Sequence, residues 1–163
     1  MKSLAIYPGT FDPPTLGHAD LIERAHTLFD RVIVAVGKNS SKTPLLTVDE
    51  RIHVLTEISK PYKNVSVEAF DGLLVDFAKA KGSKSIVRGL RAVADFEYEF
   101  QIAMVNRKLN PEVDSVFLMT RWEYSYLNSS VVREVAKLGG DVTDLVPEPV
   151  LAVLEGAVKR SKL

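Results

Sequence analysis

Short apolar runs alternate with amphipathic segments along almost the whole chain. The runs are rich in β-branched residues, which favours buried strands, whereas the apolar residues between them recur at helical spacing. The predicted strands cover 4–7, 31–36, 65–70, 85–87 and 116–119, and the predicted helices cover 17–29, 47–60, 73–81, 94–109, 129–138 and 147–159. This alternation predicts an α/β fold: a Rossmann-like, doubly wound, five-stranded parallel sheet with helices on both faces.

Length and composition limit the classes of protein that fit. A chain of 163 residues suits one domain, 1–163, closed by the C-terminal helix at about 147–159. Lys plus Arg and Asp plus Glu both number 21, so the total charge indicates neither a nucleic-acid partner nor an anionic membrane. Cysteine is absent, which excludes disulfides and Cys-type zinc sites. Without an apolar run of membrane-spanning length or a signal-peptide core, we expect a cytoplasmic protein.

The stretch from Thr10 to His18 links the first predicted strand to the first predicted helix. Gly17 and His18 fall in the first turn of that helix, where free backbone N–H groups and the positive end of the helix dipole attract phosphate. Glycine allows a close approach and the imidazole can donate a hydrogen bond to a phosphoryl oxygen. The alternative is a tight turn followed by a capping or surface histidine, and this stretch alone leaves both open.

Several polar residues follow the ends of predicted strands. Thr10, Lys42, Arg88 and the segment after Met119 each lie just beyond a strand. The carboxyl ends of parallel strands share one edge of the sheet, and ligands of doubly wound folds bind there. Topology therefore predicts that these residues converge on one crevice.

Two further segments have the chemistry of phosphate binding. Arg88-Gly89-Leu90-Arg91 places two guanidinium groups after an apolar run, and arginine binds phosphate through paired hydrogen bonds. The segment 128–133 puts hydroxyls and backbone amides at a helix start, where they can bind an anion. The alternatives are a surface charge cluster for the first segment and simple N-capping by serine for the second.

The helix predicted at 94–109 carries more apolar surface than one buried stripe needs. Phe96, Phe100 and Met104 share one face, and Tyr98 and Ile102 extend it round the side. Either the helix packs on two sides within the chain, or it forms a subunit contact. We favour the subunit contact.

Together these segments resemble the nucleotidylyltransferase superfamily, whose H/T-x-G-H signature occurs here as Thr15-Leu16-Gly17-His18. Within it, the chain is similar to the family of bacterial phosphopantetheine adenylyltransferases. Two strings carry this similarity: YPGTFDP at 7–13 and RGLRAVADFEYE at 88–99. The chain departs from the usual pattern at Thr120-Arg121-Trp122-Glu123 and at Asn128, beside the expected adenine and ribose pocket.

The resemblance implies transfer of adenylyl from Mg-ATP to 4′-phosphopantetheine, giving dephospho-coenzyme A and pyrophosphate in the penultimate step of coenzyme A biosynthesis. It implies Mg²⁺ carried by the ATP phosphates, with no metal ligands from the protein. It also implies a homohexamer built from two trimers, with dephospho-coenzyme A and coenzyme A as product and feedback ligand.

Matching positions imply roles for individual residues. The residues implied in catalysis are His18, Thr10, Lys42 and Arg91. The implied ATP contacts are Thr10, Phe11, His18, Gly89, Leu90, Arg91, Glu99, Tyr124, Ser125, Tyr126, Leu127, Asn128, Ser129 and Ser130. The implied phosphopantetheine contacts are Thr10, Lys42, Leu74 and Arg88.

Two other functions remain compatible with these residues. One is an adenylyl- or cytidylyltransferase with another phosphate-monoester acceptor, such as nicotinamide mononucleotide or a small alcohol phosphate. The other is a non-catalytic nucleotide-binding regulator, because a phosphate-binding turn demonstrates binding rather than turnover.

Overall fold

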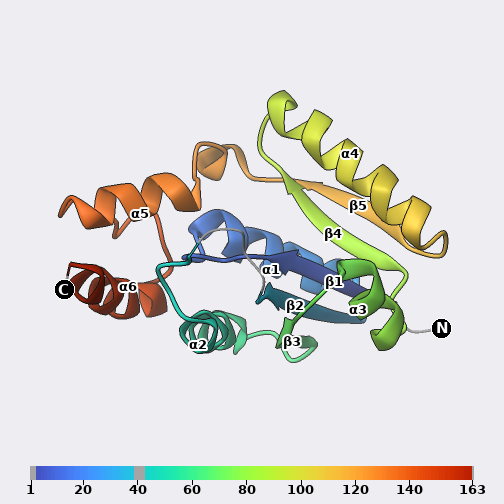
Figure 1. The fold of residues 1–163 in the computed structure, drawn as a ribbon, viewed down its shortest axis with the longest axis horizontal. Helices are drawn as coiled ribbons and strands as arrows, with labels where there is room; N and C mark the ends of the chain where they lie inside the picture. Colours follow the sequence, from blue (N-terminus) through green and yellow to red (C-terminus); the bar gives the residue numbers. More distant parts are fainter. Residues whose placement is uncertain (1–2, 39–42, 163) are drawn as a thin grey trace.

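Five parallel strands form the centre of the molecule in a computed structural model that describes residues 3–38 and 43–162 (Figure 1). The strand order is β3-β2-β1-β4-β5. The strands are β1 (Leu4–Gly9), β2 (Arg31–Gly37), β3 (Val65–Phe70), β4 (Ser85–Leu90) and β5 (Asp114–Met119). The predicted fold class is confirmed.

Helices cover both faces of this sheet. The crossover helices are α1 (Leu16–Leu28), α2 (Val48–Ser59), α3 (Leu74–Lys81) and α4 (Val93–Leu109). A short 3₁₀ helix η1 (Trp122–Tyr124) follows β5, and the chain ends with α5 (Ser129–Lys137) and α6 (Glu148–Ser161). Helix α6 packs against α2, and α5 packs against α6, past the ends of the strands (Figure 1).

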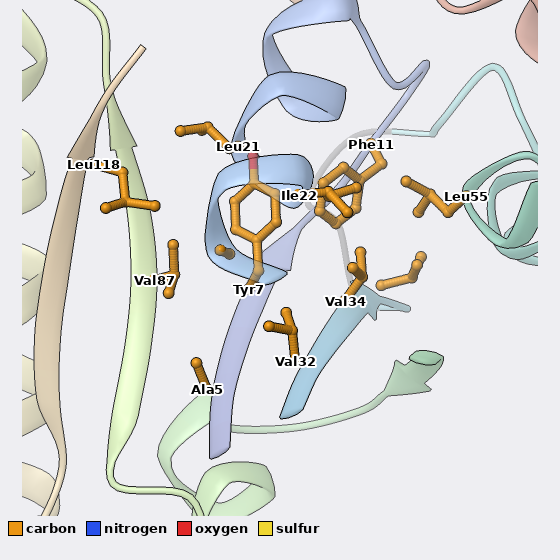
Figure 2. Close-up of a cluster of buried hydrophobic side chains, with 12 residues drawn as sticks. Ala5, Tyr7, Phe11, Leu21, Ile22, Val32, Val34, Leu55, Val87 and Leu118 are labelled. Carbon is orange, nitrogen blue, oxygen red and sulfur yellow. The ribbon is translucent and has the colours of Figure 1, made fainter. Parts of the chain in front are cut away.

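The strand residues alternate between two apolar layers. Tyr7 and Val34 pack with Leu21 of α1 and Leu55 of α2 in the cluster drawn in Figure 2. Their neighbours in sequence belong to the opposite layer, which contains Ile6, Ile33, Ala35, Ile86 and Ala78. This two-residue period explains why the central strands β1 and β2 carry continuous apolar runs: both of their faces are buried.

A separate apolar cluster connects the last two helices to α2. Val132 of α5 and Leu154 of α6 pack in it with Val54 of α2. Arg160 strengthens this junction through a 2.9 Å ion pair with Glu50. The cluster thereby holds the start of α5 close to the loop that follows β1.

Strands β1 and β4 diverge toward their carboxyl ends. β1 pairs with β2 from Leu4 to Gly9, whereas its pairing with β4 is restricted to Ala5 and Ile6. The Ser3 carbonyl accepts a hydrogen bond from β2, so by alternation along the strand Pro8 faces β4. Proline has no N–H for that ladder, and the sheet opens there.

Most of the strands extend beyond their predicted bounds, most of all at the carboxyl ends of β1 and β4 and at the start of β5, Asp114. Pro8 and Gly9 do not end β1, because they continue the ladder with β2. Likewise β4 does not end at Val87: Arg88 and Gly89 lie within it and pair with β5. In both cases the pairing of a neighbouring strand overrides the local signal of the proline or glycine.

Helix α4 is largely uncovered on its outer side. Glu99 is its one buried residue, whereas Phe96, Phe100 and Met104 are each about half exposed (47%, 50% and 52%). Packing of this helix on two sides within the chain is therefore wrong. In the described ranges, no helix is both long and apolar enough to cross a membrane.

Candidate active site

An open cavity of about 280 Å³ lies where β1 and β4 separate, above the start of α1. Tyr7, Pro8 and Gly9 form one wall, and Arg88 and Gly89 form the other. The rest of the lining comes from the first turn of α1, from α4 and from the segment after β5. Arg88 and the segment after Met119 thus meet the first turn of α1 at the carboxyl edge of the sheet.

His18 is held in one orientation by the cap of α1. The backbone N–H of Thr15 donates to its Nδ1 at 2.9 Å, and the backbone N–H of His18 faces the Thr15 hydroxyl oxygen at 3.4 Å. A ring nitrogen that accepts an N–H carries no proton, so the proton of the neutral imidazole is on Nε2. Burial lowers the pKa of His18 to about 4, helped by the positive charges of Arg91 and Arg88.

Phe11 packs beneath this histidine. Its ring meets the His18 ring edge-on at 5.1 Å between centroids and the Tyr7 ring at 5.4 Å. A Cβ on Gly9 would stand only 2.8 Å from the Phe11 ring, so glycine is needed for the ring to lie there. Phe11 is 2% exposed and belongs to the core.

The loop that carries Thr10 is tied to two other parts of the chain. Both carboxylate oxygens of Asp12 accept backbone N–H groups, from Leu45 at 2.9 Å and from Leu46 at 2.8 Å. Arg133 of α5 donates to the carbonyl of Asp12. Because Arg133 is engaged in this way, it supports the loop instead of extending toward the cavity.

Arg88 forms a bidentate ion pair with Glu99 across the cavity wall. Its Nε and Nη2 donate to the two carboxylate oxygens, each at 2.6 Å. Burial acts to lower the pKa of Arg88, but the hydrogen bonds and charge of Glu99 outweigh it and raise that pKa above its usual value. Only one edge of the guanidinium is used, which leaves N–H groups on the other edge for a phosphate.

Arg91 is held by a second carboxylate of α4, one turn before Glu99. Its Nε donates to Asp95 at 3.1 Å, and its Nη1 donates to the carbonyl of Leu127 at 2.7 Å. Residues four apart lie on one face of a helix. That face of α4 therefore orients both arginines of the cavity.

The segment after β5 is fastened to α1 by an ion pair. Arg121 Nε lies 2.8 Å from a carboxylate oxygen of Asp20, whose side chain is almost fully buried. This contact brings Thr120 and Tyr124 over Gly17, where a Cβ would lie 3.7–3.8 Å from both.

Nine of the 17 residues predicted to bind ATP or phosphopantetheine lie together in the cavity lining, and seven lie outside it. The cavity lining includes His18, Arg88, Gly89, Arg91, Glu99, Tyr124, Leu127, Asn128 and Ser129. It does not include Thr10, Phe11, Leu74, Leu90, Ser125, Tyr126 or Ser130. Thr10 is exposed in the adjoining loop, and Leu74 packs at the start of α3. Lys42 lies outside the described residues.

The start of α5 is capped by Asn128, and not by serine as the alternative interpretation had it. The Asn128 side chain accepts the backbone N–H of Ser130 at 2.7 Å. The hydroxyl of Ser129 donates to the carbonyl of Pro13 at 2.8 Å. Ser129 therefore joins α5 to the turn at Pro13, whereas Asn128 caps the helix itself.

Seven lining residues are not among the predicted contacts: Tyr7, Pro8, Gly9, Thr15, Gly17, Leu21 and Thr120. Tyr7 is 4% exposed, and burial raises its pKa, so its hydroxyl keeps its proton. Only its position in the first strand, next to the Pro-Gly pair, could have indicated it. Leu21 requires Gly89 opposite, since a Cβ there would lie 2.4 Å from its Cδ1.

The described side chains offer no cluster of metal ligands. Among the described residues, no group of three or more His, Cys, Asp or Glu could hold a metal ion. These residues do not form a protein cage for Mg²⁺.

Comparisons with known proteins agree with the fold and the motifs. A family model described as Cytidylyltransferase-like matches residues 6–135. A phosphopantetheine adenylyltransferase of Alkaliphilus metalliredigens is 56% identical over 151 residues, covering 93% of this chain and 96% of the relative. One from Azoarcus sp. is 51% identical over 159 residues, covering 98% of each.

A solved structure shows the same fold at low sequence similarity. It comes from Vibrio parahaemolyticus and is provisionally described as a nicotinate-nucleotide adenylyltransferase. Its TM-score is 0.69 at 19% identity, covering 98% of this chain and 96% of that one. With half of its residues shared with curated relatives over nearly their whole length, the chain belongs to the phosphopantetheine adenylyltransferase family of cytidylyltransferase-like proteins.

Proposed function

We propose that this protein transfers the adenylyl group of Mg-ATP to 4′-phosphopantetheine, giving dephospho-coenzyme A and pyrophosphate, in the penultimate step of coenzyme A biosynthesis. One observation carries the proposal from the structure: a neutral His18 whose Nε2–H lies in a cavity with Arg88 and Arg91. The names of relatives at 51–56% identity support the choice of acceptor.

The reaction requires no nucleophile from the protein. The phosphate monoester of the acceptor has a second pKa of about 6, so it is largely dianionic near neutral pH. One of its oxygens forms a bond to the α-phosphorus of ATP, and the bond from that phosphorus to the pyrophosphate oxygen breaks. The protein contributes by positioning the two phosphates and stabilising charge.

The side chains of the cavity divide this work. His18 donates its Nε2–H to the charge that builds on the transferring group, and it does so without releasing a proton. The unused edge of Arg88 binds the acceptor phosphate, which Thr10 and Lys42 help to orient. Arg91 and the start of α5 hold the leaving pyrophosphate. Mg²⁺ bound to the phosphates of ATP neutralises part of their charge.

We further propose one domain over 1–163, a cytoplasmic location, coenzyme A as a feedback ligand and assembly as a homohexamer. The exposed apolar side of α4 supports the assembly. Sedimentation of the wild-type protein and of Phe100→Glu tests it. We expect a hexamer that the substitution dissociates, and a monomeric wild type would refute it.

A pyrophosphate-release assay over a panel of acceptors tests the activity. We expect release of pyrophosphate with ATP and phosphopantetheine. We expect little release when nicotinamide mononucleotide or glycerol phosphate replaces phosphopantetheine, or when CTP replaces ATP. Release with one of these alternatives alone would assign a different nucleotidylyltransferase. ATP binding without release for any acceptor would instead indicate a nucleotide-binding regulator.

A further inference from the structure

Arg51 is the largest fully buried side chain of the described residues. It lies in the first turns of α2 and is 0% exposed, with Val54 and Leu55 following it on the buried side of the helix. A buried guanidinium is costly unless hydrogen bonds and countercharge offset its lost hydration. Its contacts therefore indicate what the cation does.

Those contacts join three separate segments at the carboxyl edge of the sheet. Nη1 donates to the carbonyl of Thr10 at 2.8 Å and to that of Gly37, at the end of β2, at 3.2 Å. Nε donates to the carbonyl of Thr47 at 3.3 Å. Nη2 has no hydrogen-bond partner among the residues that the structure describes. All three acceptors are backbone carbonyls, so Arg51 determines the direction of peptide groups.

The bond to Thr10 has a consequence for the next amide. The Thr10–Phe11 peptide is trans, so its N–H points opposite to its carbonyl. With the carbonyl drawn inward to Arg51, the N–H of Phe11 points away from that buried cation. No acceptor for it is found in the ranges 3–38 and 43–162. Phe11 also has a φ of 53°, in the left-handed region that occurs in anion-binding backbone nests.

The electrostatics of the loop agree with this geometry. Burial lowers the pKa of Arg51 while the carboxylate of Asp12 raises it, and arginine stays charged in proteins at neutral pH. A fixed positive charge thus lies behind the Thr10–Phe11 peptide, on its carbonyl side. That charge attracts an anion to the opposite side of the same peptide.

We propose that Arg51 is a positioning residue for phosphate binding: by holding the carbonyl of Thr10, it keeps the amide of Phe11 turned to donate to a phosphate oxygen of a substrate. The inference rests on the proposed function for the identity of the phosphate, which belongs to ATP or to phosphopantetheine. Arg51 itself contacts neither.

Two variants and a spectroscopic measurement test this role. Arg51→Lys keeps the charge but not the planar fork, and Arg51→Gln keeps a planar amide without charge. The seven phenylalanines can be labelled selectively with ¹⁵N, and a Phe11→Tyr protein identifies the Phe11 amide by its absence. In the wild type, we expect that amide resonance to move downfield on addition of ATP or of phosphopantetheine, and the active ligand identifies the phosphate.

In both Arg51 variants we expect that shift to disappear and calorimetry to show about tenfold weaker binding of the same ligand, the loss of roughly one hydrogen bond to a charged group. Arg107→Lys, on the exposed end of α4, is the matched control and should bind as the wild type does. Thermal unfolding of each variant identifies a temperature at which all of them are folded, and binding is compared at that temperature.

Three results would overturn the inference: no Phe11 shift with either ligand, a shift that persists in Arg51→Lys, or lowered thermal stability with unchanged affinities. Binding and spectra are measured without turnover, so failure of the proposed activity can be told apart from failure of the inference about Arg51. In that case wild-type protein would release no pyrophosphate although its Phe11 amide responds to ATP.

Discussion

The backbone N–H of Thr15 donates to Nδ1 of His18 over 2.9 Å, so the residue three positions earlier determines which imidazole nitrogen carries the proton. In most capping boxes a Glu or Gln at this helical position reaches back to the cap. Here a histidine does so, and the cap that begins α1 also directs Nε2–H as a donor. This relationship explains why Thr15 and His18 occur together in the signature Thr15-Leu16-Gly17-His18.

Replacing the histidine should affect turnover more than binding. We expect His18→Ala to lower kcat by roughly 10²-fold or more with ATP affinity retained, because its hydrogen bond strengthens in the transition state. His53→Ala, on the exposed side of α2, is the control and should keep wild-type kcat. Steady-state kinetics and calorimetry measure both effects. Near-normal turnover of His18→Ala would contradict the assignment.

The lowered pKa of His18 predicts the pH dependence of its protonation. With a pKa of about 4 in the folded protein, the imidazole stays neutral from pH 6 to 8 and contributes no ionisation to kcat in that range. A ¹⁵N spectrum of the three histidines checks this. A His18 titration with a midpoint near 6.5 would show that the ring is not held as described.

The same shift affects stability. Between about pH 4 and the ordinary value of 6.5, the unfolded chain binds a proton at this position that the folded chain does not. The contribution of His18 to the free energy of unfolding therefore rises with pH through that window and is complete above it. Urea unfolding of the wild type and His18→Gln at pH 5 and pH 7 gives the difference. Equal differences at both pH values would contradict the prediction.

Two glycine substitutions should have opposite effects. Gly9→Ala places a methyl group 2.8 Å from the buried Phe11 ring, and we expect it to cost about 1–3 kcal/mol and to lower kcat by moving the ring beneath His18. Gly156→Ala is the matched change in α6, where a Cβ meets nothing within 4 Å. It should stabilise by about 0.5–1 kcal/mol. Urea unfolding measures both, and a neutral Gly9→Ala would show that the ring is mobile.

The Arg88–Glu99 pair should influence the acceptor more than the nucleotide. Arg88→Lys loses the planar fork, and we expect the KM for phosphopantetheine to rise about tenfold or more while that for ATP changes less. Glu99→Gln should act in the same direction, with little added effect when Arg88 is already lysine. The exposed Glu97→Gln is the control. Equal losses for both ligands would refute this division.

Local sequence patterns were sufficient for the elements and for part of the cavity. The β-branched runs and the helical spacing of apolar residues predict strands and helices because they act over a few residues. Strand polarity then brings His18, Arg88 and Arg91 to one edge. Sequence reasoning missed the extension of β4 through Arg88 and Gly89. A glycine in isolation indicates a turn, whereas here the pairing of β5 keeps it in the strand.

The sequence by itself therefore determined the α/β alternation, the place of His18 in the first turn of α1 and several residue types around the cavity. Only the tertiary structure decided that β1 and β4 separate after Ile6, that Glu99 and Asp95 orient the two arginines, and that Arg51 is buried under the Thr10 loop. The physical reason is the sequence separation over which each interaction acts. Caps and periodicity depend on neighbours along the chain, but the burial of a charge depends on partners 14 and 41 residues away.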